Sequence, residues 1–246
     1  MAGGSSVSGT LSLSDFAHSS SAGRRISRPF GKMPPRRFYL VVCEGEATEP
    51  NYFRAIVRQL PRGMVDHVDI EGTGMNTLSL VDAAQRMVEN RKRSHLPPYY
   101  HVWLVFDRDS FPASHFNETI DTVDKINHAT KSAKNPVHWH CAWSNEAFEL
   151  WYVLHFREQL GGNVSRQALQ KMVEDEMRSQ TDEKEFRYKK NDETMFNRLK
   201  PRTVSAIGRS KRALKRQLAE KGHVWSEMNP ATRVHELVED LLSYIP

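Results

Sequence analysis

The sequence holds little cysteine and no long apolar run. Its 246 residues include two cysteines, Cys43 and Cys141, which can build neither a disulfide framework nor a four-ligand zinc site of the usual kind. No segment approaches the roughly 18 consecutive apolar residues of a membrane helix, and the start lacks the charged-then-apolar pattern of a secretion signal. These absences exclude an integral membrane protein and predict a cytoplasmic protein with reduced thiols.

An excess of positive charge is also lacking over most of the chain. The formal net charge is +5, but residues 1–37 alone hold six basic residues against Asp15, and the remainder has 29 of each sign. This first segment is rich in serine, with prolines at 29, 34 and 35, and lacks the apolar content to fold alone. We expect a disordered basic tail over 1–37. A solubilising role and a phosphate-binding role both stay open.

Alternating strand and helix patterns fill residues 38 to 157. The run FYLVVC at 38–43 is continuously apolar, as is the centre of HVWLVF at 101–106, and such runs are typical of parallel strands buried on both faces. Further strand patterns lie at 65–70 and 137–143, with helical patterns at 49–60, 78–88 and 116–129. The pattern predicts an α/β fold: an open, mostly parallel four-stranded sheet with helices on both faces.

The remaining segment, 158–246, shows no strand pattern. Ser144-Asn145 is typical of a helix cap, and the apolar run after it predicts a helix over 146–156. Four more helical patterns follow Gly162, at 169–177, 194–199, 204–218 and 231–244. We therefore expect an α/β domain at 38–157 and a basic helical extension at 158–246 that packs on it.

Positive charge is concentrated within that extension. Residues 184–221 hold 13 basic and 4 acidic residues, a balance of +9, with aromatic side chains interleaved. Basic residues beside aromatic ones are typical of a groove that binds a nucleic-acid backbone. A solvated helix face paired with acids elsewhere is the other interpretation. The candidate nucleic-acid ligands are Tyr188, Lys189, Lys190, Arg209 and Lys211.

Carboxylates follow two of the predicted strands directly. Glu44 ends the first strand, and Asp107 and Asp109 end the strand at 101–106. In an open α/β sheet, residues at the carboxyl ends of strands face the ligand crevice, where we expect Asp107 to be exposed. Three carboxylates without local bases favour a Mg²⁺ or Mn²⁺ site. Turn residues or helix caps are the alternative interpretation.

Four other polar residues have no settled role. His138 and His140 share a face of a predicted strand, a spacing that can bind transition metals. Because the sequence places no third histidine or cysteine nearby, we favour ordinary packing. Glu149 and His155 lie in the apolar run after Asn145, and Glu149 could contact the carboxylates from there.

Several segments of the chain resemble segments of known protein families. A buried strand ending in Glu-Gly, one intervening βα unit and a buried strand ending in Asp-x-Asp are similar to the metal site of the Toprim fold, found in topoisomerases, bacterial primases and OLD-type nucleases. Five further blocks are informative together: VVCEGEATEPNYF at 41–53, VFDRDSF at 105–111, SNEAFELWYVLHF at 144–156, Tyr188-x-Lys190 and NPATRVHELVEDL at 229–241. In this order they resemble the RloB-like family, and the resemblance covers the chain from Phe38 to its end. Glu146-Ala147 departs from the more usual Pro-Cys, which affects no proposed ligand.

The resemblance implies a Toprim-type domain linked to bacterial defence and to restriction or CRISPR-associated loci, sometimes beside an ATPase gene. It implies that Glu44 is the acid/base glutamate and that Asp107 and Asp109 bind the metal. Glu49 resembles the second glutamate of OLD-type sites, or else simply places negative charge at a helix N-terminus.

The predicted function is a metal-dependent phosphodiesterase or nuclease, using Mg²⁺ or Mn²⁺ on RNA or DNA as a defence effector. The alternative is a non-catalytic sensor or adaptor that binds a nucleotide or nucleic acid and works with a partner such as an ATPase or another defence protein.

Overall fold

The computed structural model describes residues 38–60, 67–73, 77–108, 112–158 and 162–244. All of them belong to one compact unit, residues 35–246. The tail expected at 1–37 and the candidate ligand Asp109 lie outside the described residues. Within the described part, no helix is long and apolar enough to cross a membrane.

A five-stranded sheet forms the centre of this unit, in the order β2-β1-β3-β4-β5. The first four strands are parallel, and β5 runs antiparallel to β4. The predicted α/β fold is confirmed, with one strand more than expected. The strands are β1 (Phe38–Cys43), β2 (His67–Gly72), β3 (His101–Asp107), β4 (His138–Asn145) and β5 (Ala231–Thr232).

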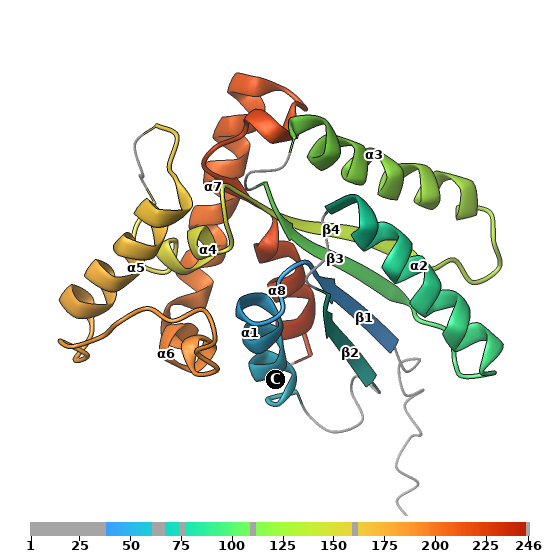
Figure 1. The fold of residues 1–246 in the computed structure, drawn as a ribbon, viewed down its shortest axis with the longest axis horizontal. Coiled ribbons are helices and arrows are strands. Elements are labelled where there is room, and N and C mark those ends of the chain that lie inside the picture. The colour runs from blue at the N-terminus through green and yellow to red at the C-terminus, as the bar shows by residue number, and fades with distance from the viewer. Residues whose placement is uncertain (1–37, 61–66, 74–76, 109–111, 159–161, 245–246) are drawn as a thin grey trace, which may run out of the picture. The chain divides into compact units, whose positions relative to one another are not determined.

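Helices cover both faces of the sheet (Figure 1). Alternate β1 residues point to opposite faces: Leu40 and Val42 pack with α2 and α3, and Val41 packs with α1 and α8. The helices are α1 (Thr48–Val57), α2 (Thr77–Arg93), α3 (Ala113–Thr130), α4 (Glu149–Val153), α5 (Arg166–Gln180), α6 (Met195–Leu199), α7 (Thr203–Lys221) and α8 (Val234–Leu242), with short 3-10 turns η2 (Lys200–Arg202) and η3 (Trp225–Glu227).

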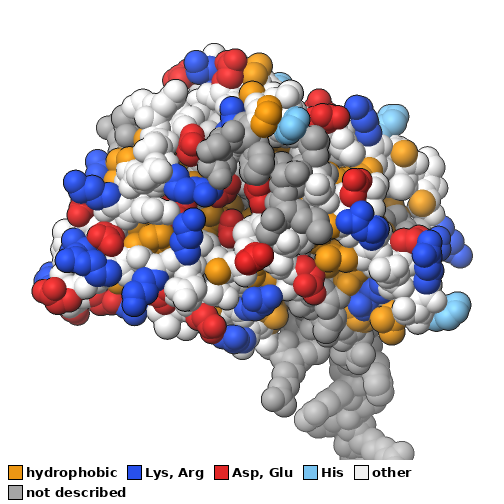
Figure 2. Space-filling view, viewed as in Figure 1, with side chains coloured by type: hydrophobic (Ala, Val, Ile, Leu, Met, Phe, Trp, Pro, Cys, Tyr) orange, Lys and Arg blue, Asp and Glu red, His pale blue; other side chains and the backbone are white. Residues whose placement is uncertain are grey.

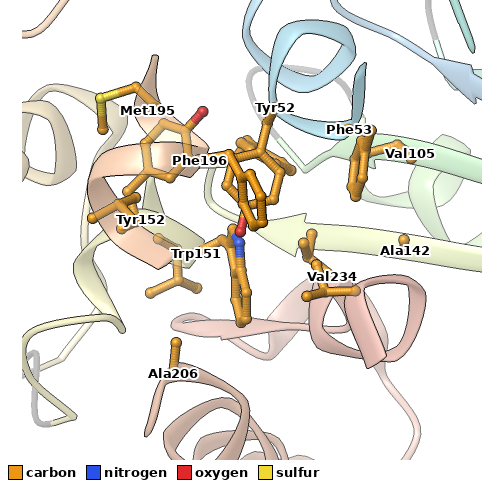
Figure 3. Close-up of a cluster of buried hydrophobic side chains, with 14 of the residues drawn as sticks. Tyr52, Phe53, Val105, Ala142, Trp151, Tyr152, Met195, Phe196, Ala206 and Val234 are labelled. Carbon is orange, nitrogen blue, oxygen red and sulfur yellow. The ribbon is translucent and has the colours of Figure 1, made fainter. Parts of the chain in front are cut away.

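Aromatic side chains join α1 to the helices that follow the sheet (Figure 3). Tyr52 of α1 is fully buried and lies edge-on to Phe196 of α6, with ring centroids 5.4 Å apart. It also contacts Trp151 and Tyr152 of α4, at centroid distances of 6.5 and 5.6 Å. This cluster fixes α4 and α6 against the helix that follows β1.

Two expectations about the chain after β4 are wrong. Residues past Gly162 are not all helical, because β5 pairs with the end of β4. Ser144-Asn145 does not cap a helix, because both residues continue β4: the Ser144 and Thr232 hydroxyls lie 3.0 Å apart, and the Asn145 amide donates to the Ser226 carbonyl. The helix expected over 146–156 is reduced to α4.

Candidate functional site

A polar cavity of about 310 Å³ lies at the carboxyl ends of β1 and β3. Carboxylates and two cationic side chains line it, supplied by the turn after β1, the end of β3, α1, α4, α5 and the segment between α5 and α6. These charged residues are Glu44, Glu46, Glu49, Asp107, Glu149, Arg166 and Lys190, of which Glu46 and Lys190 are exposed.

The ends of β1 and β3 are tied together at this cavity. The backbone N–H of Glu44 donates to the Val105 carbonyl at 2.8 Å, and the backbone N–H of Asp107 donates to Oε2 of Glu44 at 3.0 Å. The second bond fixes one oxygen of the Glu44 carboxylate beside Asp107. The structure thus brings together two of the residues that the sequence selected on separate strands.

Two glycines allow the turn after β1 to fit. A Cβ on Gly45 would lie 2.3 Å from Oε2 of Glu49, and a Cβ on Gly72 would lie 2.8 Å from both the Gly45 carbonyl oxygen and the Glu46 Cα. Both distances are too short for a real contact. The missing side chains let the turn lie against β2 and let Glu49, in the first turn of α1, reach the cavity.

Burial strongly perturbs two of the carboxyl groups. Desolvation raises the pKa of Asp107 well above its usual value; the charge of Glu49 raises it further, while Arg166 opposes the shift. Burial likewise raises the pKa of Glu49 to about 7, opposed by its backbone hydrogen bond. Asp107 is only 6% exposed, so the expectation of an exposed side chain is wrong. The reason is that β3 extends through Asp107, which pairs with Ser144 of β4.

Arg166 is a cavity residue that the sequence analysis missed. It is the first residue of α5, and its Nη2 donates to Oδ2 of Asp107 at 3.0 Å. The sequence carries a signal for it: a basic residue directly after the capping Ser165 opposes the helix dipole, so it needs a nearby acid. Which acid it meets could not be known, because Asp107 lies 59 residues earlier.

Glu149 takes a defined place in the same cavity. Its Oε1 accepts hydrogen bonds from Nε2 of Gln170 at 2.8 Å and from the Tyr188 hydroxyl at 2.9 Å. The helical region therefore orients this carboxylate. Tyr188, one of the candidate nucleic-acid ligands, packs its half-buried ring on the core beside Tyr152 and donates its hydroxyl to Glu149.

The other candidate nucleic-acid ligands divide into two groups. Lys190 lines the cavity, and its backbone carbonyl accepts a hydrogen bond from Thr48 at 3.0 Å; Lys189 beside it is exposed. Arg209 donates to the carbonyls of Leu154 and His155, and Lys211 pairs with Glu239 at 2.6 Å. The structure does not bring Arg209 and Lys211 to the cavity.

Much of the positive charge of the helical region is paired. Glu158 accepts from Arg212 and Arg216, each at 2.6 Å, and Arg198 forms an ion pair with Glu183. Figure 2 shows acidic and basic side chains interspersed at the left of the view, over α5 and α6. The local excess of basic residues is therefore partly a solvated, paired surface. Of the candidate basic ligands, Lys190 lines the cavity and Lys189 is its neighbour in the chain.

The histidines lie at the opposite end of the strands from the cavity, where β3 and β4 begin. His101 joins them there: its Nδ1 lies 3.0 Å from Nε2 of His140. His140 also stacks on Trp103, with ring centroids 4.3 Å apart, and burial lowers its pKa to about 4. His138 packs against Tyr100 and His101 in the same group. These contacts agree with the interpretation of the histidines as ordinary packed residues. None of the three lines the cavity.

The carboxylates at the cavity suit a hard divalent cation. Oδ1 of Asp107 is buried and accepts no hydrogen bond from the described residues, although a buried oxygen of this kind normally has a partner. Carboxylate oxygens are the ligands that Mg²⁺ and Mn²⁺ prefer. Among the described residues, which do not include Asp109, no three acidic, histidine or cysteine side chains converge closely enough to hold an ion as they stand. Glu44, Glu49 and Asp107 are the described residues that could supply ligands.

Comparison with known proteins adds a family but no solved relative. Neither the curated proteins nor the solved structures contain a match to this chain. The model of the family described as RloB-like protein matches residues 39–241, which include the whole cavity and, apart from the first residue of β1 and the last of α8, every strand and helix of the described chain. The chain therefore belongs to the RloB-like family.

Proposed function

We propose that this protein is a Toprim-type, metal-dependent phosphodiesterase that cleaves RNA or DNA. One observation carries the proposal: a single cavity at the strand ends combines the carboxylates Glu44, Glu49, Asp107 and Glu149 with the cations Arg166 and Lys190. A carboxylate cluster suits a divalent cation, and neighbouring basic groups suit a phosphate. Hydrolysis of a phosphodiester uses both kinds of group: carboxylates to hold the cation and basic side chains to bind the phosphate.

Each residue has a distinct part in this proposal. Asp107, with its unpartnered Oδ1, and Asp109 hold Mg²⁺ or Mn²⁺, and Glu49 adds a ligand. Bound there, the cation supplies positive charge that stabilises the phosphoryl group during hydrolysis. Glu44, oriented by the Asp107 N–H, accepts the proton of the attacking water. Lys189 and Lys190 bind flanking phosphates of the strand.

The family resemblance supports the biological setting. We place the activity in bacterial defence, in the cytoplasm, with an ATPase or another defence protein as partner. The free, buried thiols of Cys43 and Cys141 are consistent with a reducing compartment.

The test is cleavage of labelled tRNA, single-stranded RNA and single- and double-stranded DNA with Mg²⁺, Mn²⁺ or EDTA. We expect metal-dependent cutting that falls at least about 100-fold in Asp107→Asn, which keeps the side chain's shape but removes its charge. Asp124→Asn, the same change at an exposed position on α3, is the matched control and should cut normally.

Two outcomes would redirect the proposal. Cutting that survives both EDTA and Asp107→Asn would exclude this site as its source. Tight binding of one nucleic acid without any cutting would favour a sensor or adaptor that uses the same cavity.

A further inference from the structure

Arg166 provides the charge that Asp107 needs inside the cavity. Its guanidinium lies 3.0 Å from Oδ2 of Asp107, and the two side chains are 25% and 8% exposed. Buried charges persist only when they are paired. Four further carboxylates line the same cavity: Glu44, Glu46, Glu49 and Glu149. Lys190 is the other cationic side chain that lines it, and that residue is exposed. Arg166 is thus the partly buried counter-ion of the cluster.

Position and chemistry distinguish Arg166 from a purely structural ion pair. It occupies the first position of a 15-residue helix, where the dipole disfavours a cation and favours an anion. A guanidinium also presents a planar set of donors that matches two oxygens of a phosphate. The start of α5 therefore combines two features that suit a phosphate, the helix N-terminus and the guanidinium of Arg166. In this structure the guanidinium binds the carboxylate of Asp107 instead.

A divalent cation on Oδ1 of Asp107 and the guanidinium on its Oδ2 compete for the negative charge of one carboxylate. Both are positive, so a cation that binds Asp107 repels Arg166 and weakens its ion pair. The released side chain remains anchored at the cavity wall by α5. There it can bind a phosphate that the cation has also attracted.

We propose that Arg166 is an exchangeable counter-ion: it neutralises Asp107 in the empty site and binds the substrate phosphate once a divalent cation has replaced it. This inference rests on the proposed function and assigns Arg166 as a substrate-positioning residue. It implies that cation and phosphate bind cooperatively, and by linkage each strengthens the other by the same factor.

Mn²⁺ binding tests this without any need for turnover. Electron paramagnetic resonance of free Mn²⁺ gives its Kd for the full chain, with and without inorganic phosphate. We expect phosphate to tighten Mn²⁺ binding about tenfold in the wild type. Arg166→Ala should bind Mn²⁺ alone about tenfold more tightly than the wild type, because the competitor is gone, and phosphate should then change its Kd less than about twofold.

The matched control is Arg178→Ala, which removes another arginine of α5. Arg178 is similarly buried, 28% exposed, and pairs with Glu174 at 2.7 Å, more than three helical turns from Arg166. This variant makes the same change in net charge as Arg166→Ala. Its Kd for Mn²⁺, both with and without phosphate, should equal that of the wild type. Arg166→Lys, which retains the charge without the planar donors, should keep weak Mn²⁺ binding and lose most of the phosphate effect.

The possible results separate the two proposals. Arg166→Ala that binds Mn²⁺ no more tightly than the wild type, or that keeps the full phosphate effect, overturns the exchange. Failure of every protein to bind Mn²⁺ overturns the metal site and the exchange with it. The expected binding pattern without cleavage of any nucleic acid upholds the exchange and removes the nuclease proposal alone.

Discussion

At Gly45, the lack of a side chain gives the Glu49 carboxylate its place in the cavity. The Cβ of an alanine there would lie 2.3 Å from Oε2 of Glu49, so that carboxylate must move. The atom displaced is the far end of a flexible side chain, which can shift at little cost. At Gly72 the atoms in the way belong to the backbone of Gly45 and Glu46 and cannot yield so easily.

This contrast predicts different effects for two alanine substitutions. Gly45→Ala should lower the proposed nuclease activity at least about tenfold, through displacement of Glu49, and change the free energy of unfolding by less than about 1 kcal/mol. Gly72→Ala should lower both, with a loss of about 1–3 kcal/mol from overpacking. Cleavage rates and urea unfolding of both variants measure this. A Gly45→Ala protein with full activity would show that Glu49 has no part in the reaction.

Helix α6 is short, and the aromatic side chain of Phe196 helps to fix it against α1. Only five residues long, it cannot be stable by itself in water. Phe196 joins it to α1: the side chain is fully buried and packs edge-on against Tyr52. Met195 and Leu199 are buried as well, so α6 is stabilised by tertiary packing.

Loss of the Phe196 side chain should therefore destabilise the protein strongly. Phe196→Ala leaves a cavity among Tyr52 and its neighbours, and we expect a loss of about 3–5 kcal/mol in the free energy of unfolding. Phe196→Leu keeps most of the volume and should cost distinctly less. Thermal unfolding followed by circular dichroism compares the two. Equal losses would mean that the packing around Phe196 rearranges to fill the space.

The strands and helices differ in how much of them the sequence can predict. Strands β1 and β3 are predictable because each contains a continuous apolar run that stops at a carboxylate, a pattern typical of a buried parallel strand. Strand β5 is not, because two residues, Ala231 and Thr232, carry no periodicity and owe their conformation to pairing with β4. The run that contains α4 is buried on all sides, so its pattern cannot show where the helix begins.

The residues of the cavity also differ in how well the sequence predicts them. Glu44 and Asp107 can be found because each directly follows a buried apolar run, and their bond to one another confirms that they meet. Arg166 and Tyr188 come from the helical region, whose position relative to the sheet is set by tertiary packing. No local pattern records that position.

For the whole molecule, buried histidines link folding to pH. Burial lowers the pKa of His155 to about 3 and that of His140 to about 4, from about 6.5 in an unfolded chain. Below pH 6.5 the unfolded chain takes up these protons first, so acid favours unfolding until the folded-state pKa is reached. Glu49 acts in the opposite sense, because its pKa is raised and its folded form gains the proton first.

The contribution of one histidine can be isolated by difference. Between about pH 6.5 and 4, the wild type should lose about 1.4 kcal/mol more per pH unit than His155→Gln, which has no imidazole to protonate. Urea unfolding at a series of pH values, followed by tryptophan fluorescence, gives both slopes. The variant is expected to be less stable at neutral pH, since His155 Nδ1 bonds to the Trp151 carbonyl at 2.9 Å. Parallel slopes would contradict the burial of a neutral imidazole.

Because β5 pairs with the last two residues of β4, this part of the sheet is completed only late in synthesis. Ser144 and Thr232, joined through their hydroxyls, lie 88 residues apart in the chain. On the ribosome, the end of β4 therefore stays unpaired on that side until Ala231 and Thr232 have been synthesised, and unpaired strand edges invite association with other chains. Arg166 and Lys190 are likewise synthesised after every parallel strand is complete. A nascent chain thus carries the acidic residues of its cavity before the basic ones, and acquires its last strand, β5, after both.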